Sequence, residues 1–200
     1  MEKPKQIITY IAIKNNLDWD KTYEDIRTKN IPCNKDIKEY CKTHDFSNVV
    51  YILDQEYPNV LKNTRKPPFV LFYEGDLTAL NNLEDTLYFT ALNNNFKVNF
   101  NNLILVGKDD KGYYISVKGI LKLRTTDSVI EAVRVAMVLA NKIVITQYND
   151  NEINAIRIGV ARALETGKDI YCQPTSEVGT LNNRLIKEGA YLAETEQDLL

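Results

Sequence analysis

Small hydroxyl, amide and glycine residues gather near the C-terminus, where an apolar run ends and a helical pattern begins. A strand-loop-helix junction directs backbone N–H groups and the positive end of the helix dipole at its ligand, which favours an anion such as phosphate. Thr180 is explained equally well as the ordinary N-cap of the following helix. The predicted contacts are Pro174, Thr175, Ser176, Gly179, Thr180, Asn183 and Arg184.

Two further polar features lie earlier in the chain. Asn93 and Asn94 follow the predicted strand Thr86–Leu92 and could bond a base edge or a ribose, although asparagine clusters also form plain turns. Arg134 belongs to an otherwise apolar helix. Its guanidinium must reach solvent, a carboxylate or a ligand, because burial without a partner is costly. All three residues are predicted site residues.

A basic segment, Lys111–Thr126, contains no acidic residue and includes the pair Tyr113-Tyr114. Cations beside aromatic rings can hold a nucleic-acid backbone and stack a base, so Lys118, Lys122 and Arg124 are predicted contacts. A pair of strands with solvated lysines is the alternative interpretation. The net charge of −2 and pI of 5.6 require any nucleic-acid contact to be local.

The inventory of reactive side chains is small. Cys33 and Cys41 lie near the single histidine, His44, but they lack a tight knuckle and a fourth ligand, so we predict no metal and no cofactor. One histidine in a polar segment also argues against a Ser-His-Asp or Cys-His hydrolase. We therefore predict no catalytic group. Three cysteines form no even disulfide framework, which is typical of a cytoplasmic protein.

The periodicity divides the chain into two parts. Residues 1–46 carry three helix-like segments, and residues 47–200 change to short apolar runs that alternate with helical patterns. Near the C-terminus this alternation has the spacing of βαβ units, which form parallel sheets. The predicted fold class is α/β: a Rossmann-like, mostly parallel sheet flanked by helices, with a small helical N-terminal segment. The apolar runs are shorter than the roughly 20 residues that span a bilayer, so no membrane is expected.

Two blocks of the chain contain motifs in a recognisable order. Tyr57–Leu61 and Lys66–Leu77 fit Y-P-x-x-L and P-P-x-x-L-F-x-x-G-D-L. The second block fits four motifs in order: A-L-E-x-G-R at Ala163–Lys168, V-P-G at Pro174, N-x-L-I-x-x-G-A at Asn183–Ala190 and D-I-L at Asp198-Leu199-Leu200. Together these blocks resemble the DprA/Smf family of DNA-processing proteins. That family's V-G-S-R turn is replaced by Phe89–Asn95, which contains neither glycine nor arginine.

The resemblance implies a Rossmann-like fold, binding of single-stranded DNA, loading of a recombinase and formation of a homodimer. It extends only to matching positions, which near the C-terminus are Pro174, Asn183, Arg184, Gly189 and Ala190. We accordingly predict a non-catalytic DprA-like protein that binds single-stranded DNA or a nucleotide at the C-terminal edge of its sheet. DNA processing or recombination in a phage or mobile element is the expected setting. The alternatives are a sensor or sponge for a nucleotide-derived small molecule and a structural adaptor without a ligand.

Overall fold

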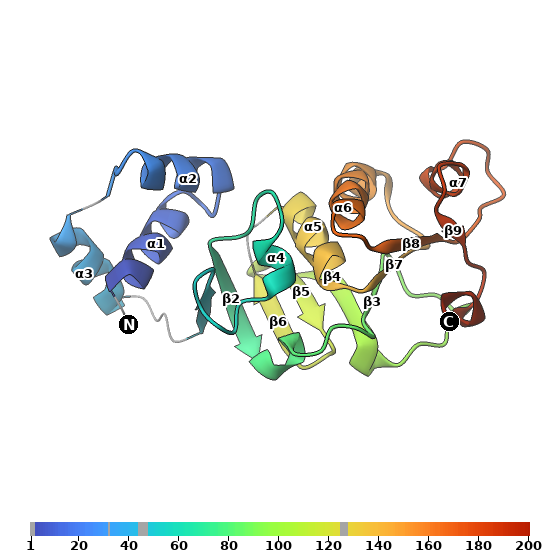
Figure 1. Ribbon diagram of the computed structural model, residues 1–200, viewed down its shortest axis with the longest axis horizontal. Helices are drawn as coiled ribbons and strands as arrows, with labels where there is room; N and C mark the ends of the chain where they lie inside the picture. Colours follow the sequence, from blue (N-terminus) through green and yellow to red (C-terminus); the bar gives the residue numbers. More distant parts are fainter. Residues whose placement is uncertain (1–2, 32, 44–47, 125–127) are drawn as a thin grey trace.

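The computed structural model describes residues 3–31, 33–43, 48–124 and 128–200. The N-terminal part consists of α1 (Lys3–Lys14), α2 (Trp19–Arg27) and α3 (Asn34–Thr43), which lie together at one end of the molecule (Figure 1). The Asp18 side chain caps α2 by accepting a hydrogen bond from the Lys21 amide at 3.0 Å. The predicted boundary between residues 46 and 47 falls outside the described residues, as does His44.

The described residues after this segment form a nine-stranded sheet in the order β1-β2-β6-β5-β4-β3-β7-β8-β9. The strands are β1 (Val49–Tyr51), β2 (Val70–Gly75), β3 (Leu87–Phe89), β4 (Leu103–Asp109), β5 (Gly112–Val117), β6 (Leu121–Arg124), β7 (Lys142–Ile145), β8 (Asp169–Cys172) and β9 (Tyr191–Leu192).

The sheet is mixed, which corrects the prediction of a mostly parallel one. β3, β4, β7, β8 and β9 are parallel to their neighbours within that group, whereas β1, β2, β5 and β6 pair antiparallel. For the pairs β4–β5 and β5–β6 the cause is the length of the connections. Tight turns follow β4 and β5, and such turns can join only antiparallel strands, because a parallel crossover needs a dozen or more residues. Among the parallel strands, α6 links β7 to β8 and α7 links β8 to β9.

One face of the sheet is covered by helices (Figure 1). These are α4 (Asn59–Lys62), α5 (Val129–Leu139), α6 (Ile153–Glu165) and α7 (Leu181–Lys187), and their apolar residues share one core cluster with the strands. α5 and α6 approach closely at Gly159, where an added Cβ would lie 2.5 Å from Met137 Sδ. No helix of the described residues is long and apolar enough to cross a membrane.

The opposite face has two separate covers. At one end α1 packs on β1 and β2, with Ala12, Val49 and Val70 buried between them. At the other end, segment 90–102, which contains the short helix η2 (Phe100–Asn102), and the C-terminal helix η4 (Glu196–Leu199) cover β3 and β7. The 3-10 helices η1 (Leu77–Leu80) and η3 (Asp150–Glu152) complete the described elements.

On the face opposite the helices α4 to α7, the strands β4, β5 and β6 lie between these two covers. No helix of the described residues lies on them there (Figure 1). We call this surface the open face. The carboxyl edge is where β3, β4, β7 and β8 end, and the amino edge is where β3, β4 and β7 begin. In α/β sheets with parallel strands, ligands bind in the crevice outside the carboxyl ends of the strands.

Candidate functional site

Polar side chains join the strand ends at the carboxyl edge. Directly after β3 and β7, the Thr90 and Thr146 hydroxyls lie 3.3 Å apart. The Thr146 amide donates to Thr90 Oγ1 at 2.9 Å, and the Ala91 amide lies 3.2 Å from Thr146 Oγ1. The rim between these two strands is therefore filled by polar groups that bond one another.

A buried amide extends this network to β8. Asn182, fully buried at the start of α7, donates through Nδ2 to the carbonyls of Ile145, Thr146 and Gln173 at 2.8–3.1 Å. Its Oδ1 has no partner among the described residues. The predicted site residue Asn93 reaches the same region, because its Nδ2 donates to Gln173 Oε1 at 2.8 Å. Asn94 is exposed beside it.

The loop between β8 and α7 closes on itself. The Thr175 and Thr180 hydroxyls lie 2.7 Å apart. Asn183 spans the loop, since its Oδ1 accepts from the Thr175 amide at 3.1 Å and its Nδ2 donates to the carbonyls of Thr175 and Glu177 at 2.8 Å. Thr180 is the N-cap of α7, and its side chain accepts from the Asn183 amide. Pro174 is half-buried and Ser176 is exposed.

Two more contacts use groups that an anion would need. The Leu181 amide at the start of α7 donates to the Tyr148 hydroxyl at 3.1 Å, and Arg184 Nε donates to the Gly179 carbonyl at 2.9 Å. A ligand at this loop would have to replace these protein contacts. Anion binding by the loop stays a prediction.

A crevice lies on the helix-covered side of the carboxyl edge. Its volume is about 140 Å³. It opens where β3 and β4 end, between the N-terminal turns of α5 and α6. Lys108 Nζ stands 5.2 Å from the ring centroid of Tyr113, across the β4–β5 pair. The lining residues used below are Tyr88, Thr90, Lys108, Tyr113 and Glu152.

The polar groups of the crevice suit binding better than proton transfer. Burial raises the pKa of the Tyr88 hydroxyl, with the Glu152 carboxylate as a smaller cause, so Tyr88 stays protonated. Glu152 Oε2 accepts from the Asn149 amide at 2.8 Å in a capping box before α6. What the crevice can offer a ligand is the Lys108 cation and the Tyr113 ring, with the Glu152 carboxylate as an opposing charge in its wall.

A second aromatic group lies across the hairpin, on the open face. Tyr114 packs over Gly107, where an added Cβ would meet the ring at 2.5 Å, so a larger residue there would require the ring to move. Lys122 Nζ lies 4.6 Å and Arg124 Cζ 5.4 Å from the ring centroid. Both predicted contacts therefore lie over one tyrosine, in cation–π geometry.

Acidic residues compensate most of the charge on this face. Arg124 pairs with both oxygens of Asp109, at 3.0 and 2.5 Å, and lowers the pKa of that carboxyl by hydrogen bonding. Lys111 bonds Glu74 at 2.9 Å and lowers its pKa likewise. Lys122 forms no ion pair with a described residue. It is thus the cation of this face that a ligand can reach most readily.

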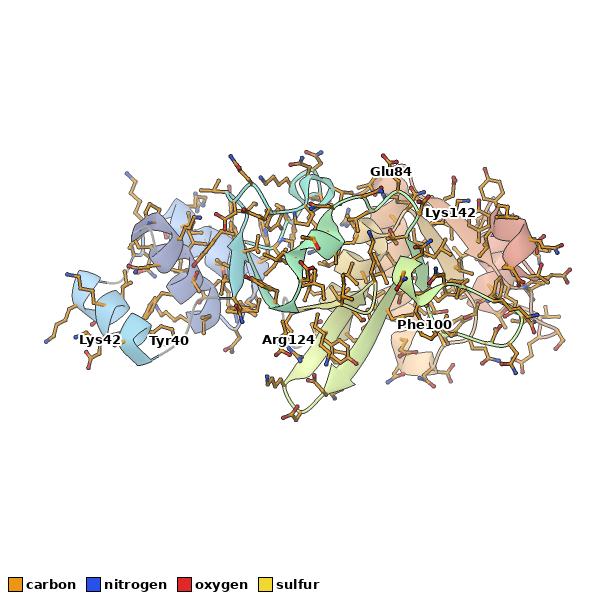
Figure 2. All side chains as sticks on the ribbon, turned by 90° about the horizontal axis from the view of Figure 1, so that it is seen from below. Tyr40, Lys42, Glu84, Phe100, Arg124 and Lys142 are labelled. Atoms are coloured by element: carbon orange, nitrogen blue, oxygen red, sulfur yellow. The ribbon has the colours of Figure 1, made fainter. Side chains whose placement is uncertain are left out.

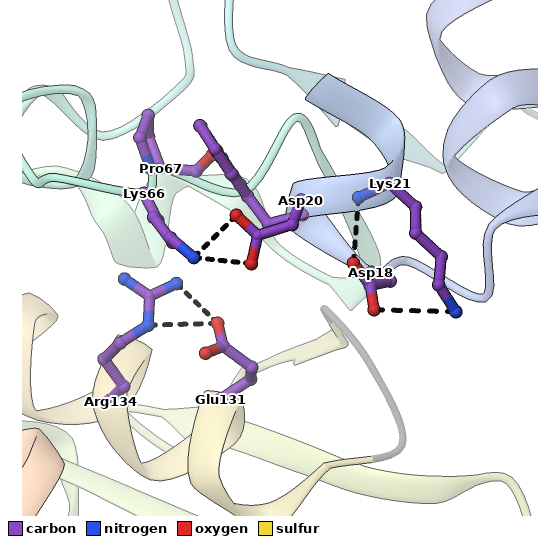
Figure 3. Close-up of polar contacts among 8 residues, drawn as sticks. Asp18, Asp20, Lys21, Lys66, Pro67, Glu131 and Arg134 are labelled. Carbon is purple, nitrogen blue, oxygen red and sulfur yellow. Dashed lines mark hydrogen bonds and ion pairs between the residues drawn. The ribbon is translucent and has the colours of Figure 1, made fainter. Parts of the chain in front are cut away.

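Two predicted site residues lie elsewhere. Lys118 is at the amino edge, where its Nζ donates to the carbonyls of Asn81 and Asn82 at 3.1 and 2.8 Å. Arg134 is buried where α5 meets the N-terminal helices, and its Nε and Nη2 donate to Glu131 at 3.0 and 2.6 Å (Figure 3). A carboxylate is thus its partner, as one of the sequence alternatives allowed.

Sequence reasoning missed Lys108 as a site residue, along with Tyr88 and Glu152. The turn Lys108–Gly112 predicts a hairpin, and a hairpin places Lys108 opposite Tyr113. The cross-strand register of this hairpin was therefore the signal in the sequence that could have identified Lys108 as a neighbour of Tyr113. Within the described ranges no group of three His, Cys, Asp or Glu side chains could hold a metal ion. Cys33 is exposed and Cys172 is buried, both as free thiols.

The fold and this edge define an α/β protein of the Rossmann-like class with a mixed sheet. No family model and no curated protein matches the chain. Among solved structures, DNA processing protein A (DprA) from Streptococcus pneumoniae is similar at a TM-score of 0.58 and 16% identity. The alignment covers 90% of this chain and 79% of that one. The chain therefore has a DprA-like fold.

Proposed function

We propose that this protein binds single-stranded nucleic acid at the carboxyl edge of its sheet and does not catalyse a reaction. The observation that carries the proposal is the crevice at the ends of β3 and β4, where Lys108 stands over the ring of Tyr113. An aromatic ring can stack a base of any identity, and a neighbouring lysine can pair with the adjacent phosphate. The DprA-like fold agrees with a role related to DNA.

The β4–β5 hairpin offers a path for more than one nucleotide. Tyr113 and Tyr114 are consecutive in β5 and point to opposite faces of the sheet, each with a lysine near its ring. The hairpin projects from the body of the molecule close to Arg124 (Figure 2). A flexible single strand can follow both sides of such a projection, whereas a stiff duplex cannot bend so tightly.

A nucleotide-derived small molecule is the second candidate, and crevice size separates it from a strand. Pockets that enclose small ligands measure roughly 300–1,000 Å³. The crevice has about 140 Å³, enough for one base or phosphate that remains attached to an exposed chain. Thermal shift with nucleotide and oligonucleotide panels distinguishes the two, and we expect only the oligonucleotides to raise the melting temperature.

A labelled oligothymidine, titrated with the protein at several salt concentrations, tests the proposal. We expect Lys108→Ala to lower affinity and to reduce the slope of log K against log salt by about 0.7, because one phosphate contact is lost. Tyr113→Leu should cost about 1–3 kcal/mol of binding free energy through lost stacking. Lys38→Ala, an exposed change on α3, should leave affinity and slope unchanged. Absence of binding to the wild-type protein at low salt would refute the proposal.

We also propose that two copies associate, as the resemblance implies. Edge strand β9 carries Tyr191 and Leu192, which are 56% and 50% exposed, and Tyr191 stacks on Tyr171. An edge strand with exposed apolar side chains can pair with another chain. Sedimentation should give the mass of a dimer, and Leu192→Lys should shift it to the mass of a monomer.

A further inference from the structure

A groove lies at the amino edge, on the far side of the sheet from the crevice. Its volume is about 530 Å³, within the range of ligand pockets. Its walls come from the residues that precede β3, β4 and β7, from the segment before η2 and from η4. Glu84 and Lys142, both groove residues, appear near each other in Figure 2.

The floor of the groove is apolar. Leu87, Val98 and Leu199 line it and belong to the core cluster on this side of the sheet. Lys142 is held away from a ligand, because its Nζ donates to the Leu199 carbonyl and lies 5.7 Å from the Tyr171 ring centroid. An apolar side chain placed on this floor would be removed from water.

Two amide side chains in the groove wall have no hydrogen-bond partner among the described residues. Asn102 and Asn141 are half-buried, and their side chains make no hydrogen bond to a described residue. Each amide offers a donor and an acceptor, which are the groups that a peptide main chain requires. By contrast, the third groove asparagine, Asn99, uses its Oδ1 to accept from the Asn101 amide at 3.0 Å.

Carboxylates dominate the accessible charge. Glu84 and Asp85 are exposed in the wall and make no ion pair with a described residue. Glu196 is fixed differently, since it accepts from the Lys97 amide at 3.2 Å, and backbone hydrogen bonds lower its pKa. The groove therefore offers two free carboxylates beside an apolar floor, and Lys97 is the opposing cation in its wall.

We propose that this groove binds an extended peptide segment of a partner protein, in which apolar side chains alternate with lysine or arginine. The amides of Asn102 and Asn141 would hold the main chain, the floor would take an apolar side chain, and Glu84 and Asp85 would pair with the flanking cations. Extended peptides are commonly recognised by main-chain hydrogen bonds plus pockets for alternate side chains. Complementary charge adds partner specificity.

Because the groove and the crevice lie at opposite edges, a peptide and a nucleic-acid strand could be bound together. The protein would then be an adaptor that brings a partner to the strand. The peptide site does not depend on the proposed nucleic-acid site, and each can be tested with the other unoccupied.

Fluorescence polarisation with a labelled peptide that alternates lysine and leucine tests the inference on the full chain. We expect saturable binding, and little binding of a peptide that alternates glutamate and leucine. Asn102→Ala and Asn141→Ala should each weaken binding about 2- to 12-fold, the effect of one hydrogen bond. The double change Glu84→Gln and Asp85→Asn should weaken binding and flatten its salt dependence.

Two exposed changes away from the groove serve as controls, Asn154→Ala on α6 and Glu188→Gln at the end of α7, and both should bind like the wild type. Far-UV circular dichroism confirms that each variant is folded. Failure of the wild type to bind the lysine-leucine peptide would overturn the proposal, as would wild-type affinity in both asparagine variants. If groove variants altered only the sedimentation of the protein alone, the occupant would be a second copy and the proposal would be wrong.

Discussion

Asn182 shows how a single side chain can organise the carboxyl edge. It is fully buried, and one amide nitrogen serves carbonyls at the ends of both β7 and β8. Buried carbonyls without donors are costly, so the residue matters for stability even if no ligand contacts it. Its neighbour Asn183 bonds mainly within the surface loop.

We expect Asn182→Ala to lower the free energy of unfolding by about 2–4 kcal/mol, because the Thr146 and Gln173 carbonyls lose their donor inside the protein, whereas Ile145 keeps the Gln173 amide. Asn183→Ala should cost about 1 kcal/mol, since its partners can turn to water. Urea denaturation of both variants measures the difference. Equal losses would contradict the assigned role of Asn182.

The Asp109–Arg124 pair gives the hairpin a pH dependence. Arg124 lowers the pKa of Asp109 in the folded protein, so the pair contributes its full stabilisation above the ordinary carboxyl pKa of about 3.9. That contribution is lost as the pH falls through the lowered value. We expect the ring signals of Tyr114, followed by NMR, to shift over this acidic range. In Asp109→Asn the same signals should shift less, and the remaining shift should come from Glu74, whose carboxyl pKa is also lowered on this face.

The packing of α5 against α6 depends on Gly159. Glycine in a helix interior is unfavourable by about 1 kcal/mol relative to alanine, yet here it allows Val133 and Met137 to approach. An added Cβ would lie 3.2 Å from Val133 Cγ1 as well as 2.5 Å from Met137 Sδ. Close packing outweighs helix propensity at this position.

Gly159→Ala should therefore destabilise the protein by about 1–2 kcal/mol, despite the gain in helix propensity, because overpacking forces the helices apart. Thermal unfolding measures the loss. Combining the change with Met137→Ala provides a control, since the smaller side chain makes room. The double variant should lose less stability than the sum of the single variants, and strict additivity would argue against the clash.

Trp19 joins the N-terminal helices to the segment that leads into β2. Its ring stacks on Phe69 with centroids 5.5 Å apart, and its Nε1 donates to the Pro67 carbonyl at 2.8 Å. Lys66 lies over the same ring and bonds Asp20 (Figure 3). Exposed ion pairs contribute little, so the aromatic contact stabilises this joint more than the Lys66–Asp20 pair does.

We expect Trp19→Ala to weaken docking of the N-terminal helices by about 2–4 kcal/mol, through lost area and one lost hydrogen bond. Hydrogen exchange should then become faster across α1 and α2, while β7 and α6 keep their protection. Asp20→Asn, which removes only the exposed ion pair, is the matched control. Equal acceleration over the whole chain would mean that the segment does not open separately.

Much of the secondary structure could be read from local patterns. The 3.6-residue period of α6 and the β-branched run of β7 are properties of consecutive residues, and the structure places elements there. The motif order likewise indicated a DprA-like fold, which the structural similarity supports. Thr180 as an N-cap needed only its neighbours in sequence.

Strand direction and the contents of the crevice were decided by tertiary contacts. Short apolar runs have the same pattern in parallel and antiparallel sheets. The sequence therefore did not predict that β2 pairs with β6, which is distant in sequence. The sequence also did not predict that Lys108 lies over Tyr113 or that Lys118 lies far from Arg124, because both placements depend on cross-strand register. Periodicity along one segment carries no information about which other segment will lie beside it, because that choice is made by burial of the shared core.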